Sequence, residues 1–191
     1  LDRAIDQNHF MMGVYAPSLT REERFAARII SSVLGEGMSS RLFLKVREQK
    51  GLAYSVRSFY DGLIDTGAIN VKAGVNVDKA DLAIRAVLEE FEELCSSPIP
   101  QEEFDKARES IKGNLVVSIE ETSAVSDWLG GQLVLLGRLI TLEELLEAYD
   151  RVDRDATYAL AQELFRRENL KVTAIGPGQS EERLRAILER R

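Results

Sequence analysis

The sequence predicts an α+β fold, in which a mostly antiparallel sheet is covered by helices on one face. Apolar and polar residues alternate as in strands at 7–15, at 52–77 and at 170–175. Between the last two segments, residues 78–166 follow the helical period instead. Strands, then a run of helices, then a final strand are typical of this layered class. Because helices outnumber strands, we expect the second sheet face to be open to solvent or to another domain.

The first predicted strand covers residues 7–15 and is closed by Pro17. Thr20 is predicted to cap the helix that follows, because a threonine hydroxyl can accept from the free amides of a first turn. The apolar face of that helix is formed by residues spaced for one side of a helix, namely Phe25, Ile29, Ile30 and Val33.

A glycine-rich break at 35–37 separates this helix from the next one. Ser39 or Ser40 can accept from the free amides of the second helix, which runs through Leu42, Phe43 and Val46. Gly51 suits the left-handed residue that ends a helix. A phosphate cradle at 35–40 is the weaker explanation, because the segment lacks the Gly-Lys-Ser/Thr ending of such loops.

The next two strands are predicted at 52–60 and 67–77, with Gly62 and Asp65 in the short connection between them. A short polar connection between strands favours an antiparallel hairpin. In the second strand one side is apolar throughout, with Ile69, Val71, Ala73, Val75 and Val77. This strand is therefore expected to cover a core with one of its faces.

The helical half of the chain begins at Asp78, where an apolar stripe faces Glu89, Glu90, Glu92 and Glu93. Residues 96–100 end this helix, and Pro100 is well placed to start the next. Adjacent pairs such as Glu92/Glu93 and Glu102/Glu103 point in different directions from a helix and are interpreted as solvated charges. Further elements are predicted as helices at 122–138, 141–149 and 153–166, a strand at 170–175 and a terminal helix through Leu184, Ile187 and Leu188.

Composition limits the class of protein. The 191 residues suit one domain, 1–191, and the net charge of −7 is spread along helices, which argues against a nucleic-acid partner. No apolar run is long enough for a membrane-spanning helix. The chain opens on Leu1, so we expect a piece of something longer, and the lone Cys95 favours a reducing compartment such as the cytoplasm.

The sequence contains few residues that could carry out catalysis. The chain has one histidine, His9, whereas zinc motifs such as H-x-x-E-H need two, so no metal site is expected on this chain. A nucleophile pair would have to join Cys95 to His9, but Cys95 ends an acidic helix, where a thiolate is disfavoured. We therefore interpret Cys95 as a structural thiol.

The junction at residues 46–56 stands out. Arg47 is predicted in the last turn of a helix and Tyr54 near the start of the following strand, so the Gly51 turn can bring both to one edge of the sheet. A structural explanation is also available, because a helix-terminal arginine complements the helix dipole and tyrosine is common in strands. On spacing alone, the structural explanation is favoured.

The same junction carries a resemblance to a known family. The segments LGEGMSSRLF at 34–43, VRE at 46–48 and GLAYSV at 51–56 closely resemble the carboxy-terminal, non-zinc half of pitrilysin, insulinase and mitochondrial-processing-type zinc metallopeptidases. The resemblance extends along the chain through Glu103-Phe104, Lys106-Ala107, Lys112-Gly113, 118–120, Gly137-Arg138 and 174–177.

The resemblance implies two similar halves that close around an extended peptide, with zinc on the missing amino-terminal half. It implies that Arg47 and Tyr54 project toward that zinc site, bind the substrate carbonyl and stabilise the oxyanion. Ser39 and Ser40 match the family too, although helix capping explains them. His9 resembles a first-strand position without a catalytic role.

The leading hypothesis is therefore the substrate-binding, chamber-closing half of a zinc metalloendopeptidase, inactive on its own. Its expected partners are a peptide substrate and the zinc-binding half, on the same polypeptide or a separate subunit, with a second copy of this chain as another candidate. An exposed apolar or mixed surface is expected where that partner packs. The alternatives are a non-proteolytic scaffold of the same family, as in the respiratory-chain core, and a free-standing peptide-binding module.

Overall fold

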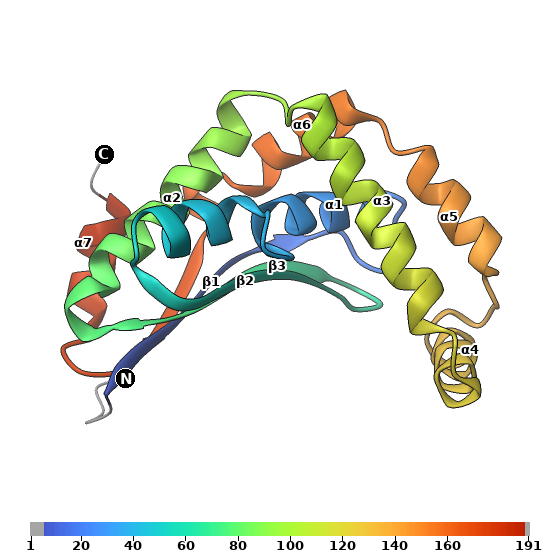
Figure 1. The fold of residues 1–191 in the computed structure, drawn as a ribbon, viewed down its shortest axis with the longest axis horizontal. Coiled ribbons are helices and arrows are strands. Elements are labelled where there is room, and N and C mark those ends of the chain that lie inside the picture. The colour runs from blue at the N-terminus through green and yellow to red at the C-terminus, as the bar shows by residue number, and fades with distance from the viewer. Residues whose placement is uncertain (1–5, 190–191) are drawn as a thin grey trace.

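The computed structural model describes residues 6–189, and its four strands form one antiparallel sheet in the order β2-β3-β1-β4. The strands are β1 (Gln7–Ala16), β2 (Ala53–Gly62), β3 (Gly67–Asn76) and β4 (Lys171–Ile175). The helices are α1 (Arg24–Gly35), the π-helix η1 (Phe43–Gln49), α2 (Ala80–Ser96), α3 (Gln101–Ser118), α4 (Thr122–Leu136), α5 (Leu142–Asp150), α6 (Arg154–Leu164) and α7 (Glu181–Glu189), with the short 3₁₀ turns η2 (Val77–Lys79) and η3 (Arg167–Asn169). The α+β prediction is confirmed (Figure 1).

The predicted alternation decides which face of the sheet is buried. β1 pairs with β3 in register, so Met12 lies opposite Val71 and Phe10 opposite Ala73, and all four are buried. The intervening residues form the other face of the sheet. That face has no helix over it among the described residues (Figure 1), and it carries His9, Met11, Tyr15, Ser55, Arg57, Lys72 and Thr173.

Helix α1 packs closely on the edge strand β2. The Ser31 and Ser58 hydroxyls hydrogen-bond at 3.1 Å between Oγ atoms. At the end of the helix, a Cβ added to Gly35 would lie 2.2 Å from the Ser58 nitrogen and 2.9 Å from the Arg57 carbonyl carbon. The glycine is therefore required by close approach to the strand backbone, rather than only as a break in the chain.

Two predicted element boundaries are corrected by the structure. Thr20 does not cap α1, which begins at Arg24, and the Thr20 hydroxyl instead hydrogen-bonds with Ser18 Oγ at 2.9 Å. β3 ends at Asn76 rather than at residue 77, because the Asn76 side chain accepts from the Asp78 amide and starts the η2 turn. Local side-chain acceptors compete with regular structure at such boundaries.

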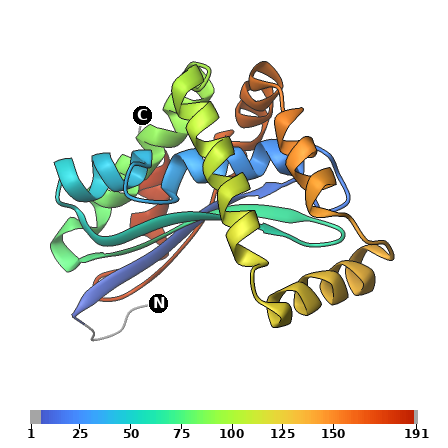
Figure 2. The same cartoon turned by 45° about the vertical axis from the view of Figure 1, so that its right-hand side comes forward.

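Helix α4 extends away from the sheet, and Figures 1 and 2 show it beyond the other helices at one end of the molecule. It passes through Gly130 and Gly131 without a break and ends at Gly137, which adopts φ 67°. Exposed apolar side chains lie at both ends of α4: Val116 and Val117 on the end of α3 that precedes it, and Leu133, Val134, Leu135 and Leu139 at its far end. Among the described helices, none has both the length and the apolar content needed to cross a bilayer.

Helix α5 is attached to α1 through aromatic packing. Tyr149 is 7% exposed, and its ring lies edge-on to Phe25 with 5.1 Å between centroids. Burial disfavours the charged phenolate and raises the pKa of Tyr149 to about 12.

We therefore expect Tyr149 to ionise about two pH units above the ordinary tyrosine pKa of about 10. Because its pKa is higher in the folded chain, protonated Tyr149 contributes fully to stability below pH 10, and this contribution falls as pH rises toward 12, by about 3 kcal/mol in total. Phenolate absorbance should show a late step that is absent from the Tyr149→Phe variant. A Tyr149 that ionises with the exposed tyrosines would contradict the burial argument.

Candidate functional site

Arg47 lies on η1 and is exposed, with 45% of its side chain accessible. Its guanidinium carbon is 4.9 Å from the centroid of the Phe43 ring, and its Nε is 3.8 Å from the carboxylate of the adjacent Glu48. Exposed contacts of this kind contribute little to stability. The side chain is therefore available for a ligand.

The turn after η1 is built as the sequence predicts. Gly51 has φ 56°, in the left-handed region, and the Leu52 amide donates to the Val46 carbonyl at 2.9 Å. Lys79 donates through Nζ to the Gly51 carbonyl at 2.8 Å. This turn connects Arg47 on η1 to the first residues of β2 over a short, well-bonded path.

Tyr54 lies in a β-bulge at the start of β2. Ala53 pairs with Val75 and Ser55 pairs with the adjacent Gly74, so Tyr54 is the extra residue of the strand. It is 58% exposed, and its hydroxyl has no hydrogen-bond partner within residues 6–189. Bulges occur next to active sites, where they re-aim a side chain.

The ion pairs beneath η1 fix the helix that carries Arg47. Arg41 donates to both carboxylate oxygens of Glu103, at 2.9 and 2.6 Å, and Lys45 Nζ lies 2.8 Å from Glu90. Burial raises the pKa of Glu90, while the hydrogen bond from Lys45 lowers the pKa of Glu93. η1 is thus held against α2 and α3 by charge-assisted hydrogen bonds.

This network corrects the prediction for Glu90 and Glu103, whereas Glu92, Glu93 and Glu102 are exposed as predicted. Glu90 is 3% exposed although it was assigned to the polar face of its helix, and Glu103 is bound by Arg41. The available signal was spacing, because Glu90 follows the buried Ala86 and Val87 by four and three residues and so shares their face. The capping role predicted for Ser39 or Ser40 is also wrong, since η1 has no side-chain cap and the Ser40 hydroxyl donates to the Gly37 carbonyl.

The two residues considered for other chemistry lie in different layers. His9 is on the uncovered face of the sheet, whereas Cys95 is in the helical layer, where its Sγ donates to the Ala161 carbonyl at 3.5 Å. Burial raises the pKa of the Cys95 thiol, which disfavours the thiolate form. They form no nucleophile pair. Within residues 6–189, no three histidine, cysteine or carboxylate side chains gather in a way that fits a metal ion.

Comparison with known proteins identifies the family. Residues 2–111 match the domain family described as the peptidase M16 inactive domain. The chain belongs to the M16 peptidase family. It is an inactive domain of zinc-protease-like proteins, as the resemblance of residues 34–56 implies.

Relatives of this M16 domain are longer zinc proteases. An uncharacterised zinc protease of Streptomyces coelicolor is 31% identical over 93% of this chain, and the zinc protease YmxG of Bacillus subtilis is 31% identical over 90%. The M16 chain spans 38% and 42% of their lengths, about two fifths.

Solved structures share the fold of this M16 domain. A protease from Helicobacter pylori superposes with a TM-score of 0.82 at 23% identity, covering 91% of this chain and 42% of that one. An M16 inactive domain from Pseudomonas fluorescens gives 0.82 at 19% identity, covering 94% and 43%. A chain of complex III2 from Candida albicans gives 0.85 at 18% identity, covering 98% and 48%.

Proposed function

We propose that this chain is the substrate-binding, chamber-closing half of a zinc metalloendopeptidase, and that residues 1–191 act in it as one domain. Arg47 and Tyr54 then contact a peptide that is held between the two halves, while the zinc ion is bound by the other half. The observation that carries the proposal is that both side chains are exposed and lack strong structural partners, while the elements beneath them are well fixed. The names of the relatives as zinc proteases support it.

The chemistry assigned to the two residues follows from their donors. Hydrolysis of an amide passes through a tetrahedral intermediate with a negative oxygen, and donors aimed at this oxygen stabilise it more than the starting carbonyl. Arg47 supplies a permanent cation with several N–H groups, and Tyr54 supplies a neutral hydroxyl. The described residues do not fit a zinc site, so this half binds and orients the carbonyl but does not activate the attacking water.

Closing a chamber also requires a surface for the partner. The exposed apolar residues of α4 and of the end of α3 fit this need, because patches of this kind mark protein interfaces. We assign them to contact with the zinc-bearing half, covalently linked or separate. A second copy of this chain is the other candidate for that contact.

We expect the purified chain to contain no stoichiometric zinc and to cleave no peptide, because one histidine leaves too few ligands of the required kind. Metal analysis after dialysis measures the first, and a quenched fluorescent peptide library measures the second. The complete protein should cleave the same library and lose this activity with a zinc chelator. One tightly bound zinc per chain, held by its own side chains, would overturn the assignment to the non-zinc half.

A scaffold without proteolysis is the second candidate. It is favoured by the likeness in fold to a chain of complex III2, at a TM-score of 0.85, and by the same exposed apolar residues. The complete protein distinguishes the two functions. If it carries zinc ligands on its other half and cleaves peptides, the scaffold is excluded; if it assembles with partners but cleaves nothing, the peptidase is excluded.

A further inference from the structure

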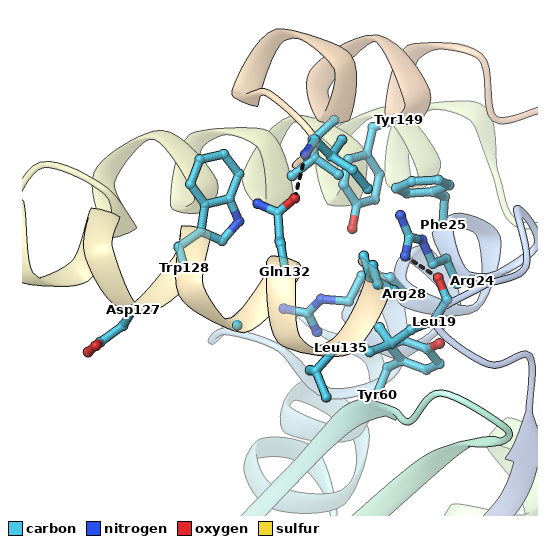
Figure 3. A pocket seen from close by; sticks show the side chains of 14 residues that line it. Leu19, Arg24, Phe25, Arg28, Tyr60, Asp127, Trp128, Gln132, Leu135 and Tyr149 are labelled. Atoms are coloured by element: carbon cyan, nitrogen blue, oxygen red, sulfur yellow. Dashed lines mark hydrogen bonds between the residues drawn. The ribbon is translucent and has the colours of Figure 1, made fainter. Parts of the chain in front are cut away.

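A pocket of about 380 Å³ lies between α1, α4 and α5, and neither Arg47 nor Tyr54 lines it. This volume falls in the range of roughly 300–1,000 Å³ that is usual for small-molecule sites. Figure 3 shows side chains from these helices around one space. The walls are mostly apolar, formed by Phe25, Trp128, Leu135, Leu136, Ile140 and Leu145.

One wall of the pocket carries a cation without an anion. Arg24 donates to the Leu19 carbonyl, and its guanidinium carbon lies 4.6 Å from the centroid of the Phe25 ring. No carboxylate within residues 6–189 forms an ion pair with it, whereas the neighbouring Arg28 is paired with Glu36. Burial lowers the pKa of Arg24, so an anion beside it would offset the cost of desolvation.

The opposite wall carries an unused donor. Gln132 on α4 accepts through Oε1 from the Ile140 amide at 2.7 Å, and this contact fixes the orientation of its side chain. The Nε2 group is then buried without any acceptor. Buried amide donors normally have a partner, so this one indicates an acceptor supplied by a ligand. Asp127 lines the same pocket but points away from it (Figure 3).

We propose that this pocket binds the carboxyl terminus of a peptide that ends in an apolar residue. Arg24 pairs with the terminal carboxylate, Gln132 Nε2 donates to an amide carbonyl of the peptide, and the apolar walls take the side chain. Guanidinium and carboxylate form charge-assisted hydrogen bonds, which are stronger than neutral ones. A fatty acid shares the carboxylate and the apolar body but lacks the amide carbonyl. The proposal is independent of the peptidase function, because binding requires no zinc-bearing half.

Trp128 reports directly on the pocket, because it is the single tryptophan of the chain. We expect its fluorescence to change saturably when the full chain is titrated with the peptide acetyl-Ala-Leu-Leu. The same peptide with a carboxamide end should bind at least about tenfold more weakly, since it loses the charge-assisted contact. Octanoate should also bind more weakly than the peptide acid. Equal affinity for the acid and the amide, or the absence of a saturable change in fluorescence, would overturn the proposal. Octanoate that binds as tightly as the peptide acid would overturn the assignment of Gln132 to a peptide carbonyl.

Two variants test whether Arg24 makes the contact with the terminal carboxylate. Arg24→Gln should weaken binding of the peptide acid at least about tenfold and remove the difference between acid and amide. Arg21→Gln is the matched control, because Arg21 lies one turn earlier, is exposed and pairs with Glu23 outside the pocket. Circular dichroism establishes that each variant is folded, and the comparison of acid with amide on the unmodified chain decides the question if Arg24→Gln does not fold. Unchanged affinity in a folded Arg24→Gln variant would contradict the proposal.

Discussion

Replacing Tyr54 by phenylalanine in the complete zinc-bearing protein is expected to lower kcat about a hundredfold. The change removes only a hydroxyl that has no hydrogen-bond partner within residues 6–189. Its effect is therefore expected in the transition state, where a donor to the negative oxygen is lost, and not in folding. Steady-state kinetics with a fluorogenic peptide measures kcat and KM separately, and most of the loss should appear in kcat.

The controls separate the site from the rest of the surface. Tyr15→Phe removes a hydroxyl from a similarly exposed tyrosine on β1 and should leave kcat unchanged. Arg47→Ala should lower kcat in the same way as Tyr54→Phe and also raise KM, because a cation contributes to binding the substrate. Zinc content and melting temperature should not change in any of the three. A Tyr54→Phe enzyme that turns over at the rate of the unmodified one would remove Tyr54 from the mechanism.

The largest effect on stability is expected from Gly35→Ala. The new methyl group would lie 2.2 Å from the Ser58 nitrogen and 2.9 Å from the Arg57 carbonyl carbon, and backbone atoms cannot rotate away as a side chain can. Relief of the clash requires α1 to move off β2. We expect a loss of about 3 kcal/mol in the free energy of unfolding. For a chain of this length the melting temperature should fall by roughly 6–12 °C.

Gly113→Ala is the matched control for this prediction. Gly113 lies inside α3, and nothing is within 4 Å of the position that its Cβ would take. Alanine removes conformational freedom from the unfolded chain, so the variant should gain up to about 1 kcal/mol. Urea unfolding of both variants measures the two changes. If Gly35→Ala were as stable as the unmodified chain, the close contact between α1 and β2 would not exist as described.

The parts of the fold that depend on periodicity were predictable from the sequence. Alternation in β3 gave the buried face of the sheet, and Gly51 gave the turn that brings η1 to β2. Helix starts were less predictable, because several polar residues compete to cap the same turn. Thr20 has a suitable side chain, yet its hydroxyl is engaged by Ser18 and α1 begins four residues later.

The candidate site was predictable only in part. Arg47 and Tyr54 could be singled out by their spacing and by resemblance to a family, but their exposure depends on tertiary structure. The bulge is defined by the register with β3, which a single strand does not contain. The spacing of Glu90 indicates its buried face, but its partner Lys45 lies 45 residues earlier in the sequence. Pairings across such distances leave no local pattern.

As the extra residue of the bulge, Tyr54 could be removed without changing how β2 pairs with β3. Because Ala53 and Ser55 already face neighbouring residues of β3, deletion of Tyr54 alone would leave an uninterrupted ladder with every other side chain on its present face. Deletion of Val56, by contrast, would move the residues before it to the wrong face of the sheet. A descendant of this gene could therefore lose the phenol through the loss of one codon and still fold. Under the role proposed for Tyr54, versions of this domain with and without a phenol donor for the substrate are then a single deletion apart.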